Sequence, residues 1–352
     1  MTVSRKGTTL FEEIAYRLGF ERLEERIEWL PNPFVCWGIS VFFIDLIILQ
    51  ALKEWHGYQA TFYTNPIWVI QPVLVLLAPF VVIYLHNRYE SALHMIDYTD
   101  RTSNPETFES LTLRKLRIGI YLIAISYSIY QFSVSIGIGT ITEVGGIAEL
   151  LGVIVILPLG YGVIFAEFLA TYIELMIVLP RKIKKSDFQI NFFDPEELGG
   201  LRPVGELMKV TYYFVVFGLI SFAIMIYAPA IVDPLTDSPY PDPGLIENLL
   251  FTLVWLLAIG TMVYGLAQIH WFMKRRKREE LFRLDRESRN LIENQFDMKE
   301  FEILDEEAHE DVRQRMEYVR NTQEYPTTFT MWIQILIGLI LPKAVQVVLS
   351  SV

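Results

Sequence analysis

Apolar residues gather in long runs along the chain, and polar residues separate one run from the next. A helix of about 20 apolar residues is long enough to cross the hydrocarbon core of a bilayer. The pattern therefore predicts an all-α polytopic membrane protein. The seven predicted transmembrane helices cover residues 33–52, 66–85, 116–137, 147–179, 210–232, 245–271 and 329–349.

The composition supports the same class. Of the 352 residues, 52% are hydrophobic, and the mean hydropathy is +0.34. A soluble domain of this length is less apolar. The lipid bilayer is therefore the first expected partner, and nucleic acid is not expected to bind.

Basic residues mark alternate connections between the predicted spans. They precede the first span, follow the second and the fourth, and open the segment after the sixth at 274–278. The connections 138–146 and 233–244 contain no Lys or Arg. Because Lys and Arg concentrate on the cytoplasmic side, we expect a plasma-membrane protein with a cytoplasmic amino terminus and an outer carboxyl terminus.

The polar segments on the expected cytoplasmic side divide the chain into four parts. Residues 1–32 should form an amphipathic helix at the membrane surface. Residues 33–271 should form a bundle of six spans with helical inner loops, and 272–326 an anchor-like cytoplasmic helical segment that bundles beneath the membrane. Residues 327–352 contain the seventh span, a candidate pore helix.

The sequence contains no motif of a known catalytic site, so we expect neither an enzyme nor a bound cofactor. The lone Cys36 excludes an intrachain disulfide. His86, Glu90 and His94 share one face of a predicted helix, a spacing that suits a metal but occurs often on solvated helices. We therefore expect no metal there.

Charged residues inside predicted spans are candidates for function, because they are costly in hydrocarbon. Asp45 and Lys343 lie at similar depth in two spans of the same direction, which favours an ion pair between them. Lys343 could instead face water or an anion, or extend outward without a partner. Glu167 should contact the inner helices, with proton transfer as the alternative.

Two predicted spans carry polar stripes. In the last span, small and polar residues recur every four positions, at Gln334, Gly338, Pro342, Gln346 and Ser350. Such a stripe suits either close helix packing or a narrow path filled with water.

The third span carries Ser126, Tyr127, Tyr130 and Gln131. These polar groups need partners or water inside a membrane. They could line a pocket for a small ligand, or they could donate hydrogen bonds to neighbouring helices.

The arrangement of the spans resembles that of the insect odorant and gustatory receptor-like ion channels, which have seven spans and an outer carboxyl terminus. The motif of that family in the last span is Thr-Tyr, five apolar residues, then Gln-Phe. Thr327 and Gln334 stand here at that spacing, whereas Thr328, Thr330 and Ile335 depart from the motif.

The resemblance implies a homotetrameric cation channel, lined by the seventh span and opened by a small ligand bound in the outer half of each subunit. Lys343 should then point away from the pore axis. A proton- or ion-coupled secondary transporter is the main alternative, although we find no internal repeat that such transporters often contain. A non-conducting membrane sensor or scaffold is the third candidate function.

Overall fold

The chain is almost entirely helical in a computed structural model. The structure describes residues 9–64, 66–109, 114–130, 137–227, 244–295 and 300–350. One small antiparallel sheet is described, in which Ile292 pairs with Ile303 and Glu293 with Glu302.

Helices α1 to α9 form the first half of the chain. Their bounds are α1 Leu10–Arg17, α2 Phe20–Arg26, α3 Pro33–Phe43, η1 Ile44–Leu49, α4 Gln50–Trp55, α5 Thr61–Thr64, η2 Pro66–Val69, α6 Ile70–Met95, α7 Tyr98–Arg101, α8 Glu106–Glu109 and α9 Arg114–Tyr130.

The second half contains the longest helices. The elements are α10 Ile138–Leu151, η4 Gly152–Tyr161, α11 Gly162–Ile173, η5 Glu174–Val178, α12 Leu179–Lys185, α13 Arg202–Ile226, α15 Leu245–Asn290, β1 Ile292–Glu293, β2 Glu302–Ile303, α16 Glu306–Asn321 and α17 Phe329–Ser350.

Six helices of the described chain are long and apolar enough to cross a membrane, which confirms the helical membrane-protein class. They cover Pro33–Trp55, Pro66–Met95, Gly145–Lys185, Arg202–Ile226, Asn248–Asn290 and Phe329–Leu349. Each overlaps one of the seven predicted spans. The remaining predicted span, 116–137, is described as α9 up to Tyr130, and 131–136 lie outside the described residues.

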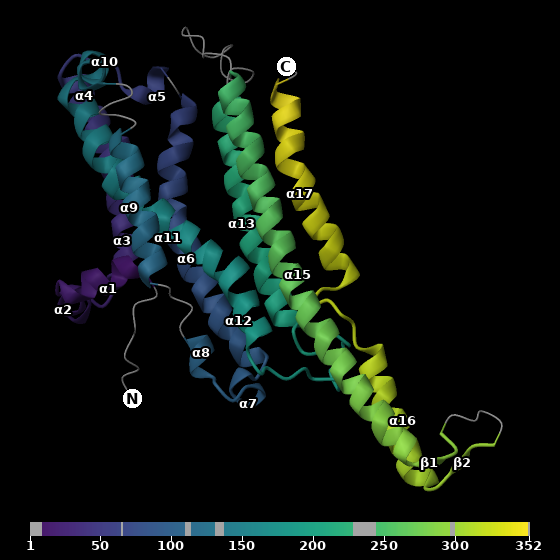
Figure 1. Cartoon of the computed structure of the whole chain (residues 1–352). Coiled ribbons are helices and arrows are strands. Elements are labelled where there is room, and N and C mark those ends of the chain that lie inside the picture. The colour runs from purple at the N-terminus through teal and green to yellow at the C-terminus, as the bar shows by residue number, and fades with distance from the viewer. Residues whose placement is uncertain are drawn as a thin grey trace.

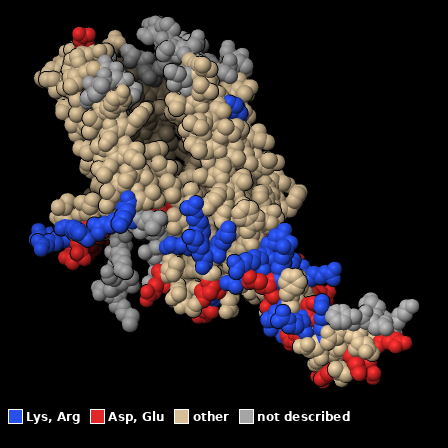
Figure 2. Space-filling model, viewed as in Figure 1, with Lys and Arg blue, Asp and Glu red and all other residues tan. Residues whose placement is uncertain are grey.

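The helices form two groups that stand side by side (Figure 1). One group contains α3, α6, α9 and α11, and the other contains α13, α15 and α17. Contacts between α6 and α13 join the groups, and the largest apolar core extends from Leu85 and Phe108 to Met208 and Phe272. Figure 2 shows a recess between the groups in the upper part of the view.

Small residues allow the closest contacts within the first group. A Cβ at Gly38 in α3 would lie 2.7 Å from the Pro79 ring of α6, and a Cβ at Gly160 would lie 2.8 Å from Val41. Backbones that approach this closely gain van der Waals contact, which holds helices together in a bilayer. These glycines therefore fix how α3 packs on α6 and η4.

Beyond the bundle, α15 and α16 form an arm (Figure 1). Leu284 of α15 is buried with Val312 and Val319 of α16. Asp305 caps α16 by accepting a hydrogen bond from the Ala308 N–H at 3.0 Å. The arm corresponds to most of the predicted anchor-like segment, 272–326.

Charged residues gather at one end of the molecule. Figure 2 shows Lys and Arg where the apolar body ends, and mixed charges farther along the α15–α16 arm. A bilayer would place such a belt of basic side chains at its interface.

The amino-terminal segment contains two short helices instead of the single amphipathic helix predicted for it. Thr9 caps α1 and accepts a hydrogen bond from the Glu12 N–H at 3.1 Å. Gly19 then adopts a φ of 99°, a left-handed conformation that favours glycine, and α2 follows. The break at Gly19 separates the two helices.

Candidate functional site

Helix α17 lies at the edge of the molecule and packs mainly against α13 (Figure 1). Met331 and Ile335 anchor its amino-terminal half, since both are buried and Ile335 belongs to the large core. The indole N–H of Trp255 in α15 donates a hydrogen bond to the Leu339 carbonyl at 2.9 Å. One side of α17 is therefore covered within the subunit.

The polar stripe of α17 lies largely on this covered side. A Cβ at Gly338 would lie 3.3 Å from the Tyr212 ring of α13, and Pro342 is buried. The buried Gln346 amide donates hydrogen bonds to Tyr227 and, at 3.0 Å, to Asn248. Within the chain these contacts suit the packing alternative for the three residues, and a place beside an open path stays a prediction for an assembly. The side chain of Ser350 lies outside the described part.

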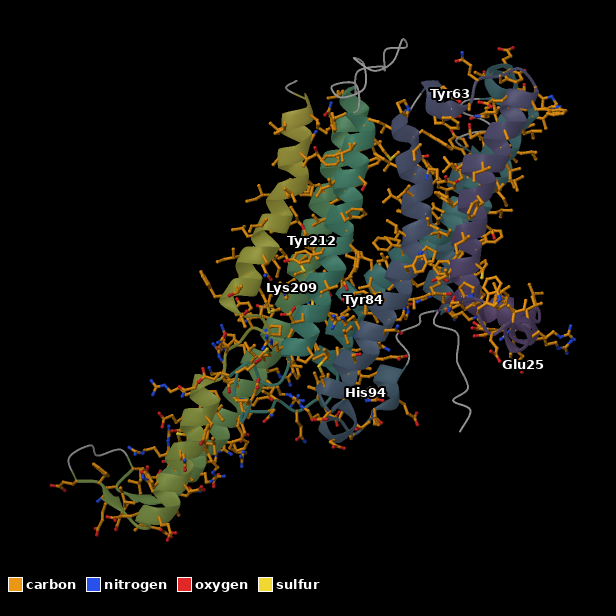
Figure 3. The ribbon with its side chains drawn as sticks, turned by 180° about the vertical axis from the view of Figure 1, so that it is seen from behind. Glu25, Tyr63, Tyr84, His94, Lys209 and Tyr212 are labelled. Carbon is orange, nitrogen blue, oxygen red and sulfur yellow. The ribbon has the colours of Figure 1, made fainter. Side chains whose placement is uncertain are left out.

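Gln334 is the member of the stripe that remains exposed. Its carbonyl accepts a hydrogen bond from Lys209 of α13 at 3.1 Å, and Lys209 also pairs with Glu206 at 2.6 Å. Figure 3 shows Lys209 and Tyr212 at successive levels of α13. The stripe thus places Gln334 and the Lys209–Glu206 pair together near the amino-terminal end of α17.

The uncovered side of α17 is apolar. Its exposed large side chains are Phe329, Trp332, Ile333, Leu336, Ile337, Ile340, Leu341, Val347 and Val348. We call this set the α17 outer face. At 100° per residue, Gln334 and Lys343 lie on opposite borders of the face.

Asp45 and Lys343 do not form the predicted ion pair within the subunit. Asp45 accepts a hydrogen bond from Tyr161, whereas Lys343 donates one to Thr252 of α15 at 3.2 Å. The two residues belong to different helix groups, with Asp45 in η1 and Lys343 in α17. Equal depth in the membrane does not make two helices neighbours.

The two residues that match the family motif lie near the amino-terminal end of α17. Thr327 is buried, and its methyl group would lie 3.3 Å from a Cβ at Gly205. The same Cβ would lie still closer to the backbone of Pro326. Gly205 in α13 therefore provides the space for the segment that joins α16 to α17. This segment precedes Gln334 in the chain.

The expected ligand-pocket residues of the third span are not enclosed by the described helices. Ser126 is exposed, and Tyr127 and Tyr130 are 65% and 59% exposed. Gln131 lies outside the described residues. Within the chain, α9 therefore turns these side chains away from the described bundle.

A buried ionic cluster joins α1, α9, α11 and η5. Arg117 of α9 donates to both oxygens of Glu174, at 3.0 and 2.7 Å, and also pairs with Glu167. One oxygen of Glu167 accepts hydrogen bonds from Tyr121 at 2.7 Å and from the Leu10 N–H at 2.8 Å. All three charged side chains are nearly inaccessible to solvent.

Glu167 stands out in the sequence as a charge within a predicted span, whereas its partners Arg117 and Glu174 were not predicted. A base near the start of one apolar span and two acids in another were the available signal, because buried charges in membranes pair. Glu167 contacts α1 as well as α9, so it fastens the amino-terminal helix to the bundle.

The candidate metal triad does not converge. His86 contacts the Val82 carbonyl and lies 3.4 Å from an Arg117 nitrogen, whereas Glu90 and His94 are exposed. Figure 3 shows His94 near the lower end of α6. Among the described residues no three His, Cys, Asp or Glu side chains are grouped to hold a metal.

Comparisons with family models, curated proteins and solved structures find no match to this chain. The candidate sites are defined by the contacts of the described residues alone.

Proposed function

We propose that this chain forms a membrane ion channel as a homotetramer in which α17 of every subunit lines a central path. The observation that carries this proposal is the position of α17 at the edge of the subunit. The helix is covered by α13 and α15 on one side, while the α17 outer face is exposed along its length. Four copies around an axis would bring these faces together.

The chemistry of the α17 outer face suits a gate. A ring of apolar side chains excludes water when it is narrow and conducts when it widens. Ile333, Ile337 and Ile340 would form successive rings of this kind. Gln334, beside Lys209 and Glu206, would supply polar groups at the inner mouth.

The net charge of the chain favours cations over anions. The formal charge of the chain is −11, and a negative surface raises the local concentration of cations. Lys343 is turned toward Thr252 at the border of the α17 outer face, away from its centre. This geometry reduces the repulsion that a lysine would exert on a passing cation.

The remaining features are proposed to serve assembly and gating. We place the charged belt and the α15–α16 arm in the cytoplasm, so that seven spans begin inside and end outside the plasma membrane. The arms of neighbouring subunits would then meet beneath the bilayer. The recess between the two helix groups offers space for a small ligand that opens the gate (Figure 2).

A proton-coupled transporter is the second candidate, and the buried ionic cluster favours it. Two carboxylates, Glu167 and Glu174, share one guanidinium, that of Arg117. An excess of acid at membrane depth is typical of proton relays.

Two experiments on the purified full-length chain distinguish these functions. Light scattering with the detergent mass subtracted should give four copies per particle, and planar bilayers should show discrete current steps. A monomer that carries no current, and that moves a solute when a proton gradient drives the transport, would replace the channel with the transporter.

A further inference from the structure

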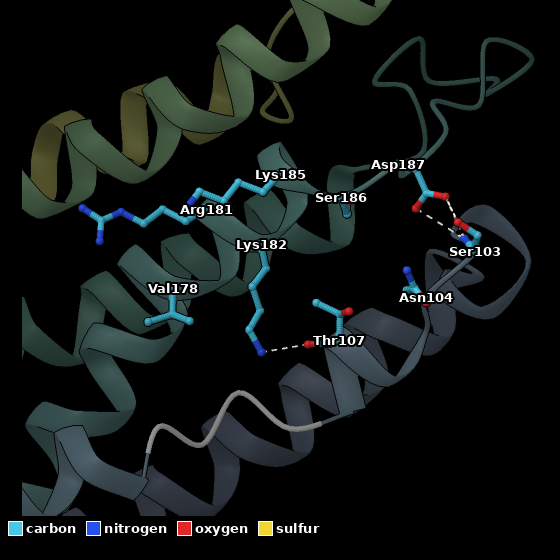
Figure 4. A pocket seen from close by; sticks show the side chains of 9 residues that line it. All are labelled: Ser103, Asn104, Thr107, Val178, Arg181, Lys182, Lys185, Ser186 and Asp187. Carbon is cyan, nitrogen blue, oxygen red and sulfur yellow. Dashed lines mark hydrogen bonds between the residues drawn. The ribbon is translucent and has the colours of Figure 1, made fainter.

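A pocket of about 610 Å³ lies at the inner end of the bundle, between α12 and the segment that contains α8. Its size is within the range of small-molecule sites. The residues that line it are Ser103, Asn104, Thr107, Val178, Arg181, Lys182, Lys185, Ser186 and Asp187 (Figure 4). None of them belongs to α17 or to the buried ionic cluster.

The lining carries an excess of positive charge. Arg181 and Lys182 lie one turn before Lys185 on α12, and Asp187 follows that helix. Arg181 donates a hydrogen bond from Nε to the Tyr264 hydroxyl at 2.5 Å, which places its guanidinium at the border of the pocket. Thr102 and Ser103 donate hydrogen bonds to the Asp187 carboxylate, which lowers the pKa of Asp187 to about 2. The carboxylate thus remains charged and engaged with the loop, and the lining contains three bases and one acid.

The wall opposite α12 is held in place. Lys182 donates to the Thr107 carbonyl at 2.7 Å (Figure 4), and Tyr89 of α6 donates to the Phe108 carbonyl at 2.5 Å. Phe108 is fully buried in the large core. Asn104 and Thr107 lie on this anchored segment and contribute an amide and a hydroxyl to the lining. These neutral groups can donate hydrogen bonds in addition to those of the basic side chains.

The pocket lies where the apolar body ends. Val178 contributes an apolar wall, and α12 is the last part of a membrane-crossing helix that ends at Lys185. Nearby, Lys184 stacks over the Trp271 ring at 5.0 Å, an arrangement of a base and an aromatic ring that is typical of the membrane interface. A lipid phosphate occupies this depth in a bilayer.

We propose that this pocket binds a phosphate-bearing anion, and that its source is the headgroup of an anionic membrane lipid. Arg and Lys donate charge-assisted hydrogen bonds to phosphate oxygens. Basic pockets between spans on the cytoplasmic side suit such headgroups. The acyl chains would lie along the apolar surface beside Val178.

Native mass spectrometry of the full-length chain in detergent tests this proposal. The protein is titrated separately with phosphatidic acid, with phosphatidylcholine and with glycerol phosphate. Phosphatidic acid should bind more tightly than phosphatidylcholine. At about 1 kcal/mol for each basic residue, Lys185→Gln should weaken that binding about fivefold, and Arg181→Gln with Lys185→Gln should weaken it more than tenfold.

The control removes two charges elsewhere. Arg22→Gln with Arg313→Gln changes two exposed arginines, on α2 and α16, and should leave binding unchanged. Glycerol phosphate that binds as tightly as phosphatidic acid, and is lost in the pocket variants, would keep the site and make its ligand a soluble phosphate. Equal binding of both lipids, or an equal loss in the control, would overturn the proposal.

Discussion

Lys209 of α13 donates a hydrogen bond to the side-chain carbonyl of Gln334 in α17 at 3.1 Å. The contact lies at the border between the covered side of α17 and its apolar outer face. Glu206, one turn before Lys209, completes the group. The last helix is therefore fixed to the bundle by a polar group at one end and by Gly338 and Gln346 farther along.

The exposed amide of Gln334 should affect conduction more than folding. Gln334→Leu removes a polar group from the proposed inner mouth, so we expect a smaller single-channel current with unchanged expression. The contact is exposed, and exposed polar pairs contribute little to stability. Ser126→Leu, which changes an exposed polar residue on α9, is the matched control. Equal currents in both variants would place Gln334 outside the ion path.

The close contact at Gly205 makes a separate prediction. Gly205→Ala places a methyl group against the backbone of Pro326, which cannot move without shifting the start of α17. Overpacking of this kind costs about 1–3 kcal/mol. Thermal unfolding in detergent should show a lower melting temperature for the Gly205→Ala protein than for the unchanged protein.

Gly218→Ala is the control for Gly205, because it lies on the same helix and a Cβ there would meet no atom within 4 Å. Alanine favours a helix over glycine by about 1 kcal/mol. Gly218→Ala should therefore leave the melting temperature unchanged or raise it. A Gly205→Ala protein as stable as the Gly218→Ala protein would argue against the close contact between Gly205 and Pro326.

Glu167 should be essential for the stability of the first helix group. Glu167→Gln leaves the buried Arg117 with one carboxylate partner and weakens the hydrogen bonds to the α1 backbone. Removal of one member of a buried ion pair costs about 3–5 kcal/mol. Glu13→Gln, at an exposed pair with Arg17, should change the melting temperature little. Similar melting curves for the two variants would contradict the structural role.

Removal of divalent metal should have no effect on stability. His86 faces Arg117, whereas Glu90 and His94 are exposed, so these three side chains share no ion. The melting temperature with excess EDTA should equal that without it. A decrease that zinc restores, and that His94→Ala abolishes, would show a metal site on α6.

The membrane helices follow from the sequence because a run of apolar residues predicts a span by itself. Asp45 and Lys343 lie in two helices that are long and apolar enough to cross a membrane, as the sequence predicts. Their partners do not follow, because depth does not determine which helices are neighbours. Asp45 meets Tyr161 and Lys343 meets Thr252.

The polar stripe of α17 illustrates a second limit of the sequence. A glycine and an amide on one side of a helix suit both water and a neighbouring helix. The structure uses Gly338 and Gln346 for contacts with Tyr212 and Asn248. The apolar side chains, which look like the lipid-facing side in the sequence, form the face that the proposed channel turns toward its axis.

The most direct measurement is the block of single-channel current by a cysteine-reactive cation in the Cys36→Ser protein. Ile340→Cys places a thiol at the centre of the α17 outer face, and Leu122→Cys places one on an exposed position of α9. We predict that the reagent reduces the current of the Ile340→Cys channel and leaves that of the Leu122→Cys channel unchanged. Absence of current from the Cys36→Ser protein, or an equal response of both variants, would contradict a central path lined by α17.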